Sequence, residues 1–275
     1  MPIASAFRSA LLVFGVALSA FISPALLAQS STAADGFNPN VDGNVYAIAR
    51  QPDGKLILAG SFNHVQPNGA TQPTGRINLA RVLPDGRNDD SFQPGVLDGQ
   101  VNAIALQSDG KIIIGGTFTT IGGTPRVRLA RLNADGSLDS TFSPTFDGSL
   151  TSDVMAIALQ ADGNIVVGGG FTKVNGEEHN RLARIKADGS LDTDFKPNAS
   201  GMVLSLAVQS DQQILVGGGF TTLSGTARKR IARLKSDGAV DADFDPSANN
   251  AVSAIEVLPD GRILIGGSPT TLQPN

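Results

Sequence analysis

The chain of 275 residues contains no cysteine, no tryptophan, one tyrosine and two histidines. Without cysteine there are no disulfide bonds, thiolate metal sites or cysteine nucleophiles. Two histidines are too few for a three-histidine zinc site, and no G-x-S-x-G segment marks a serine nucleophile. Only 17% of the residues are charged, the formal net charge is −4, and no long basic run occurs. We therefore expect no nucleic-acid partner, because binding a phosphate backbone needs a basic surface.

The N-terminus has the pattern of a secretory signal peptide. No charged residue occurs between Arg8 and Asp35, and residues 10–22 read ALLVFGVALSAFI. Small residues suit cleavage after Ala28, with Ala25 as the second choice. Serine and proline interrupt the apolar segment, whereas an uncleaved anchor needs a predominantly apolar span of about 20 residues.

These features predict a signal peptide over 1–28, a short linker over 29–36 and a repeat domain over 37–275. The protein is then exported to the periplasm, the cell surface or the medium, and it has no stable membrane insertion after signal cleavage. Hydrophobic residues make up 41% of the chain, which is enough for a sizeable core.

The remainder of the chain is an internal repeat of about 50 residues. A first block, such as VNAIALQSDGKIIIGGTF from Val101, recurs without gaps from Val45, Val101, Val154, Val203 and Val252. A second block, such as LARLNADGSLDSTFSP from Leu129, recurs from Leu79, Leu129, Leu182 and Ile231. Self-similarity at this period is typical of architectures in which each repeat stacks on its neighbours.

Each repeat is predicted to form two β-hairpins, because apolar runs rich in Val, Ile and Leu are separated by Asp-Gly turns. The strands of the first hairpin are apolar on both faces and must be buried between neighbouring repeats. Radial stacking of such units makes an all-β fold, a β-propeller of about five blades. A β-helix is the alternative, but its repeats are usually shorter and lack paired hairpin turns.

The pattern V-x-A-I-A-x-Q-x-D-G-K-I-x-x-G-G-x-F followed by R-L-A-R-L-x-x-D-G-S-L-D-x-x-F-x-P resembles the delta-60 repeat, a β-propeller family of secreted and surface proteins, mainly bacterial. The resemblance covers residues 37–269. It implies a propeller-like module of unassigned biochemical function, with no established catalytic residues.

The last repeat has a first block but no second block, and an isolated Phe37-Asn38-Pro39 precedes the first repeat. Propellers commonly combine strands from both termini in one blade, so we expect Phe37–Pro39 to supply the last strand of the fifth blade. Its third strand is missing. We favour a C-terminally incomplete chain over an open ring; in a third alternative, a partner donates a strand by β-augmentation.

The polar residues that recur in every second block are interpreted as structural. Four arginines are expected to pair with a repeated aspartate or to bond carbonyl groups, locking each blade: Arg81, Arg131, Arg184 and Arg233, with Asp89, Asp139, Asp192 and Asp241. A calcium site would need six to eight converging oxygens, and each blade offers two carboxylates, so we predict no metal. The repeated phenylalanines are assigned to the core between blades.

Residues that differ between repeats are the candidates for function. His64 lies in an insertion over 63–75, and the loop over 172–180 contains His179 and two adjacent glutamates, which point apart in an extended chain. Arginines at two positions before each second block lie two residues apart, so on an extended strand they would share one face, and they could together bind acidic glycans or carboxylates. These are Arg76, Arg126 and Arg228, with His179 at the same position, and Arg128, Arg181 and Arg230. The favoured alternative is that they pair with acidic residues of neighbouring blades.

The sequence thus predicts an exported, non-enzymatic scaffold or binding module that contacts a protein or a glycan through loops or one propeller face. No catalytic residue and no cofactor are predicted. The alternative is an enzyme acting on polysaccharide, a hydrolase or lyase, which needs two carboxylates within about 10 Å in the central channel. Glu256 is the acid to check, because the other repeats carry alanine at its position.

Overall fold

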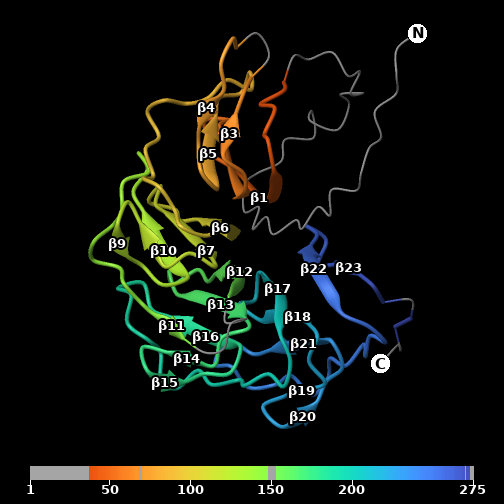
Figure 1. Ribbon diagram of the computed structural model, residues 1–275. Helices are drawn as coiled ribbons and strands as arrows, with labels where there is room; N and C mark the ends of the chain where they lie inside the picture. Colours follow the sequence, from red (N-terminus) through yellow and green to blue (C-terminus); the bar gives the residue numbers. More distant parts are fainter. Residues whose placement is uncertain (1–36, 68–69, 148–152, 270, 273–275) are drawn as a thin grey trace, which may run out of the picture.

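A computed structural model describes residues 37–67, 70–147, 153–269 and 271–272. The predicted signal peptide (1–28) and linker (29–36) lie outside these ranges. The described chain consists of β-strands, turns and connecting segments (Figure 1), and none of its segments is a helix long and apolar enough to cross a bilayer. The all-β class expected from the repeat is confirmed.

Each repeat begins with an inner strand that pairs with a middle strand across a turn that is Asp-Gly in every repeat but the fourth, where it is Asp211-Gln212. The inner strands are β1 (Asn44–Arg50), β6 (Val101–Leu106), β12 (Val154–Leu159), β17 (Val203–Val208) and β22 (Val252–Val257). The middle strands are β2 (Leu56–Ser61), β7 (Ile112–Gly116), β13 (Ile165–Gly169), β18 (Ile214–Gly218) and β23 (Ile263–Gly267). In repeats 1 to 4 the middle strand also pairs with an outer strand: β5 (Leu79–Val82), β10 (Leu129–Leu132), β16 (Leu182–Ile185) or β21 (Ile231–Leu234).

The first hairpin forms because its turn chemistry matches the strand twist. Gly110 has a φ of 85°, a conformation that glycine adopts without steric cost. The Asp109 carboxylate accepts a hydrogen bond from the Lys111 amide at 3.0 Å, and the Gly110 amide donates to the Gln107 carbonyl at 3.0 Å. The same bonds recur in the other repeats, so the Asp-Gly turns sit where the sequence predicts them.

The second predicted hairpin is shorter than expected. In the second repeat its return strand is reduced to one bridge between Leu132 and Leu138. The Asp139 amide then donates to the Arg131 carbonyl at 2.9 Å, and the Phe142 amide donates to the Asp139 carbonyl at 3.4 Å. The chain therefore turns at Asp139, and the aspartate bonds the backbone instead of continuing a strand.

A small hairpin between the middle and outer strands was not predicted; we call these the rim hairpins. They comprise β3 (His64–Val65) with β4 (Thr74–Gly75), β8 (Thr120–Ile121) with β9 (Thr124–Pro125), β14 (Lys173–Val174) with β15 (Glu177–Glu178), and β19 (Thr222–Leu223) with β20 (Thr226–Ala227). Each also pairs with the segment before an inner strand, as in β11 (Phe146–Asp147) with β14.

The repeats follow one another around an arc, and each inner strand contacts the next one (Figure 1). The core lies between repeats: in one cluster Ala49 and Ile57 of repeat 1 pack against Val101, Ile104 and Ile112 of repeat 2. Glycines on the middle strands admit this packing. A Cβ on Gly168 would overlap the Val203 side chain of the next repeat.

The two ends of the arc differ from its interior. Phe37 forms no strand; it lies beside Gly86 of repeat 1, in the way that Phe92 of repeat 1 lies beside Gly136 of repeat 2. At the other end β22 and β23 make a two-stranded sheet among the described residues. Leu264 on β23 is 54% exposed, whereas Leu215, at the same position of β18, is fully buried.

Candidate functional site

A buried ion pair recurs at the same position of each second block. In the second repeat Arg131 donates from Nε to Asp139 Oδ2 at 2.8 Å, and both side chains are less than 10% exposed. The same pair joins Arg81 to Asp89, Arg184 to Asp192 and Arg233 to Asp241. Each guanidinium also stacks on a phenylalanine; Arg131 lies 4.6 Å from the centroid of Phe142.

The aspartates are held in the charged form. Burial raises the pKa of Asp89, but hydrogen bonds from Ser91 and Arg81 outweigh it and lower the pKa to about 2. Thr141 and Arg131 donate to Asp139 in the same way, and its pKa is lowered further because Lys111 donates to it as well, at 2.6 Å. These carboxylates are therefore saturated by donors from their own repeat.

The arginine also crosses to the next repeat. Nη1 of Arg81 donates to the Ala134 carbonyl at 2.6 Å, Arg131 to Ala187 at 2.7 Å, and Arg184 to Ser236 at 2.5 Å. The sequence predicts that these arginines pair with a carboxylate or bond carbonyl groups, locking each blade. The side chain makes both, and the carbonyl bond locks one repeat to its successor.

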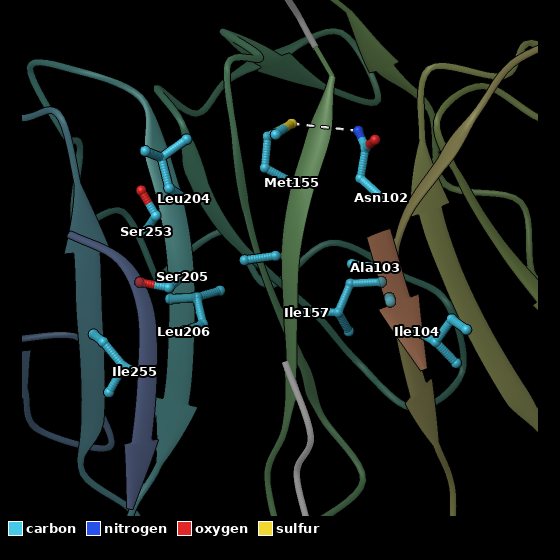
Figure 2. Close-up of a pocket in the computed structure, with 12 residues that line it drawn as sticks. Asn102, Ala103, Ile104, Met155, Ile157, Leu204, Ser205, Leu206, Ser253 and Ile255 are labelled. Carbon is cyan, nitrogen blue, oxygen red and sulfur yellow. Dashed lines mark hydrogen bonds between the residues drawn. The ribbon is translucent and has the colours of Figure 1, made fainter. Parts of the chain in front are cut away.

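The inner strands enclose a narrow cavity of about 30 Å³. Figure 2 shows Asn102, Met155, Leu204 and Ser253 along it, with Asn102 Nδ2 3.3 Å from Met155 Sδ. The same amide donates to the Val154 carbonyl at 3.1 Å. A cavity of this size is well below the roughly 300 Å³ of small ligand sites, and no carboxylate is among the described residues that line it.

Two acids have pKa values raised by burial, Asp153 and Glu256. Asp153 precedes inner strand β12, while Glu256 is the fifth residue of inner strand β22. Since inner strands run in the same direction in all repeats, the two acids differ by five positions, roughly 16 Å along the strand direction. This offset exceeds the separation of catalytic carboxylate pairs.

The arginines at the first variable position bond to their own repeat. Arg76 pairs with Asp90 at 3.1 Å, Arg126 donates to the Ser140 carbonyl at 3.3 Å, and Arg228 donates to the Asp241 carbonyl at 3.1 Å. Arg228 is 8% exposed. These guanidiniums are engaged by backbone and side-chain acceptors, so a ligand-binding role for them stays a prediction.

The second set of arginines does not share a strand face with the first, so the predicted common face is wrong. Arg128, Arg181 and Arg230 have φ values of 66° to 68°, so the chain there is not extended and the alternation of faces does not apply. Arg128 donates to the Phe146 carbonyl at 3.0 Å and Arg181 to the Ala199 carbonyl at 2.8 Å. Arg230 donates to the Gly219 carbonyl.

His179 occupies the arginine position in the third repeat and is fully buried. Neither ring nitrogen has a hydrogen-bond partner among the described residues. Burial lowers the pKa of His179, and Lys196 lowers it further, while Glu177 and Asp192 oppose the shift. The imidazole is therefore held in its neutral form beneath the third rim hairpin.

The third rim hairpin differs from its counterparts in charge. Lys173, Glu177 and Glu178 are exposed, and Glu177 lies 3.8 Å from Lys196. At the corresponding positions β8–β9 carries Thr120, Thr124 and Pro125, and β19–β20 carries Thr222, Thr226 and Ala227. Adjacent Glu177 and Glu178 pair across the strand with Val174 and Lys173.

The second, third and fourth rim hairpins share one backbone design. Asn175 and Gly176 at the third tip have φ values of 52° and 84°, and the same two positions of the second and fourth hairpins also have positive φ. Val174 beneath the tip is fully buried. A Gly-Gly, Asn-Gly or Ser-Gly pair four residues after the repeated phenylalanine was the sequence signal that could have revealed these hairpins.

His64, the other histidine candidate, lies on the first rim hairpin. Its Nδ1 is 2.8 Å from Asp42 Oδ2. Asp42 also accepts hydrogen bonds from the backbone amides of His64 and Asn63, and these bonds lower its pKa to about 2. In the described part of the chain no cluster of three or more histidine or acidic side chains could hold a metal ion.

Solved structures share the fold at low sequence identity. The virginiamycin B lyase of Staphylococcus aureus is 16% identical with a TM-score of 0.52, and the match covers 83% of this chain and 65% of the lyase. The WD40 β-propeller domain of Doa1 is 14% identical with a TM-score of 0.50, over 82% of this chain and 62% of that one. The chain thus spans less than two thirds of either protein.

A gluconolactonase of Xanthomonas campestris is 15% identical with a TM-score of 0.45, over 84% of this chain and 72% of the enzyme. No curated protein matches the sequence. The lyase and the WD40 domain have different roles, and both are less than 25% identical to this chain, so the likeness identifies the fold alone.

The sequence itself matches a family described as a domain of unknown function (DUF5122) beta-propeller. The match covers residues 51–92, 107–142, 160–195 and 209–244, which together make up more than half of the chain. Each segment starts just before the first Asp-Gly turn position and ends on the phenylalanine that stacks on the arginine. The chain therefore belongs to the DUF5122 β-propeller family, the delta-60 repeat.

Proposed function

We propose that this protein is an exported, non-enzymatic scaffold that binds a protein or polysaccharide partner through its rim hairpins. The observation that carries the proposal is that the second, third and fourth rim hairpins share one backbone but present different side chains, with the third one charged. A repeated scaffold acquires a specific surface through what differs between its copies.

The core of each repeat supports this assignment of roles. The recurring arginines, aspartates and phenylalanines already contact one another within and between repeats, as Arg131 illustrates. The rim hairpins instead expose Lys173, Glu177 and Glu178 over the buried anchor Val174. Exposed side chains on an anchored hairpin are positioned for contact at low conformational cost.

The charge of the third hairpin indicates the partner chemistry. Glu177 lies 3.8 Å from Lys196, and Lys173 stands opposite Glu178 across the two strands, so the hairpin presents charges of both signs. A partner that offers both hydrogen-bond donors and acceptors, such as a polysaccharide or a protein surface of mixed charge, would complement it. An enzymatic role is less well supported, because the two acids with raised pKa lie far apart along the inner strands.

The test replaces the third hairpin's exposed residues by those of the fourth. The triple variant Lys173→Thr, Glu177→Thr, Glu178→Ala keeps the turn and the anchor, so the unfolding midpoint should not change. Binding to a panel of neutral, acidic and cationic polysaccharides, and to isolated envelope proteins, should fall at least tenfold for whichever partner the wild type binds. The matched control is Thr226→Ser, Ala227→Ser on the fourth hairpin.

Two further measurements address the other parts of the proposal. Release of reducing ends or unsaturated sugars from the same polysaccharides would contradict the non-enzymatic role. Export is tested by the mass of the protein recovered outside the cytoplasm of a bacterial host, which should correspond to a chain starting at Gln29. Recovery of the uncleaved chain in the cytoplasm would contradict export.

A further inference from the structure

Among the described residues, the β22–β23 hairpin lacks the outer strand that the corresponding hairpins of repeats 1 to 4 have. In repeats 1 to 4 the middle strand is paired on its far side with an outer strand, as β18 is with β21. Within the described residues β23 pairs with β22 alone, and the edge that corresponds to the β18–β21 contact is unpaired. An unpaired strand edge is a row of backbone donors and acceptors that can accept another strand.

The burial of β23 reflects the missing neighbour. All residues of β7, β13 and β18 are buried, whereas β23 is partly exposed throughout and Leu264 and Gly267 are exposed. In the fourth repeat the Gly218 amide donates to the Arg230 carbonyl at 2.9 Å. The corresponding Gly267 amide has no such carbonyl acceptor in the described chain.

Two side chains of the fourth repeat, Arg233 and Phe244, also lack a contact that their counterparts make with the second block of the next repeat. Arg81, Arg131 and Arg184 each donate to a carbonyl of the next repeat's second turn. Arg233 makes its pair with Asp241 and stacks on Phe244, but it has no inter-repeat carbonyl among the described residues. Its side chain is 23% exposed, compared with 9% for Arg131.

Phe244 is the second such side chain. In the interior of the arc the phenylalanine of one repeat packs on the turn glycine of the next; a Cβ on Gly238 would lie 2.8 Å from the Phe195 ring. Phe195 is fully buried as a result. Phe244 is only half-buried, because the fifth repeat offers no second turn within the described chain.

We propose that the free edge of β23, together with Arg233 and Phe244, is an acceptor site for a polypeptide segment of the second-block type. The segment would be a strand of apolar-Ala-Arg-apolar sequence followed by an x-x-Asp-Gly turn. The strand would pair with β23 as β21 pairs with β18. The turn would offer a carbonyl to Arg233 and a glycine surface to Phe244, as residues 231–238 offer them to Arg184 and Phe195.

The choice of occupant follows from the interface that is already formed inside the chain. Repeats 2, 3 and 4 each hold their own second block by the same three contacts: the edge of their middle strand, the arginine of the preceding repeat on a turn carbonyl, and the phenylalanine of the preceding repeat on a turn glycine. A generic strand would satisfy the edge, but it would provide neither the turn carbonyl nor the glycine. The site therefore selects for a repeat's second block over other extended peptides.

The probe is an acetylated, fluorescent peptide with the sequence of residues 231–246, IARLKSDGAVDADFDP, titrated against the full chain. We expect saturable one-to-one binding. Hydrogen exchange at the β23 amides that face the free edge should slow at least tenfold when the peptide is bound. A scrambled peptide of the same composition is the matched control and should not bind in the same concentration range.

Variants on each side of the contact separate the proposed fit from nonspecific adhesion. The protein variant Arg233→Gln should bind the peptide at least tenfold more weakly, while Arg262→Gln, an exposed arginine on the same hairpin as β23, should stay within twofold. If Arg233→Gln destabilises the fold, the peptide variant Gly238→Val tests the same contact with an unchanged protein. It should bind at least tenfold more weakly.

Absence of binding, or binding that leaves the β23 amides unprotected, would overturn the proposal. Equal binding of the Gly238→Val and parent peptides would overturn it as well. A dimer whose β23 edge is protected before any peptide is added would assign the edge to a second copy of the chain, and so would overturn the choice of occupant.

Discussion

At the scale of single residues, one arginine per repeat connects three parts of the molecule. Arg131 pairs with Asp139, stacks on Phe142 and donates to the Ala187 carbonyl of the next repeat. Each contact satisfies a different part of the guanidinium, whose rigid fork of donors suits several fixed acceptors. A lysine could not replace it, since its single ammonium group cannot stack and donate in these directions together.

We expect Asp139→Asn to destabilise the protein by about 3 kcal/mol, because it leaves the buried Arg131 guanidinium without a counter-charge. Lys111 would lose the same partner. Denaturant unfolding of the variant and the wild type measures this difference. The control is Arg262→Gln, whose side chain is 76% exposed beside Asp260. If both variants unfold at the wild-type denaturant concentration, the buried pair does not stabilise the fold.

At the scale of elements, the first hairpin was predictable because its signals are local. Asp-Gly turns and apolar strands recur at fixed spacing, and the structure places β6 and β7 around Asp109-Gly110. The rim hairpins were missed because strands of two residues carry too little periodicity to be detected. The partner of each repeated arginine in the next repeat was also not predictable, since a backbone carbonyl leaves no mark in the sequence.

The candidate site was predictable in part. The loop over 172–180 was singled out because it differs from the other repeats, and the structure places its glutamates on the exposed rim. The proposed face shared by the arginines was wrong, because a positive φ at Arg128 and its equivalents cannot be read from residue type. Positive φ is uncommon for residues other than glycine, asparagine and aspartate.

Glycines on the middle strands give a prediction at this scale. We expect Gly168→Val to cost about 3 kcal/mol, since its side chain would overlap Val203 and force the third and fourth repeats apart. The largest residue at this position in any repeat is Ala59. The measurement is the free energy of unfolding in denaturant.

Gly266→Val is the matched control, because it occupies the same position of β23. A Cβ there would meet only the Ala254 side chain, at an ordinary contact distance of 3.5 Å. The Gly266→Val variant should have the same free energy of unfolding as the wild type. Equal destabilisation by the two substitutions would show that the glycines serve the strand itself and not the packing between repeats.

At the scale of the whole molecule, stability is distributed over contacts between successive repeats. Repeats 1, 2 and 3 each contribute an arginine–carbonyl bond and a buried phenylalanine to the boundary with the next repeat. Architectures of this kind behave approximately as a sum of repeat and interface terms. Titration of the paired groups should therefore act on the stability of the entire arc.

The pH dependence should have two separate windows. The pKa of His179 is lowered by burial, so below about pH 6.5 the unfolded chain takes up a proton that the folded chain does not, and stability falls. The pKa of Asp89 is lowered to about 2, so its contribution is complete above the unfolded value of about 4 and is lost as the pH falls toward 2. The pKa of Asp139 is lowered further, so its contribution to stability is likewise lost as the pH falls.

Variants assign each window to its residue. His179→Arg restores the arginine of the other repeats, so its stability relative to the wild type should increase as the pH falls from 7 to 5. The advantage of the wild type over Asp139→Asn should instead be constant in that range and shrink below about pH 4. Thermal unfolding at half-unit pH steps measures both differences. If the His179→Arg difference does not change between pH 7 and 5, the buried imidazole is not the group that titrates there, and a solvated imidazole with an ordinary pKa would be the simplest explanation.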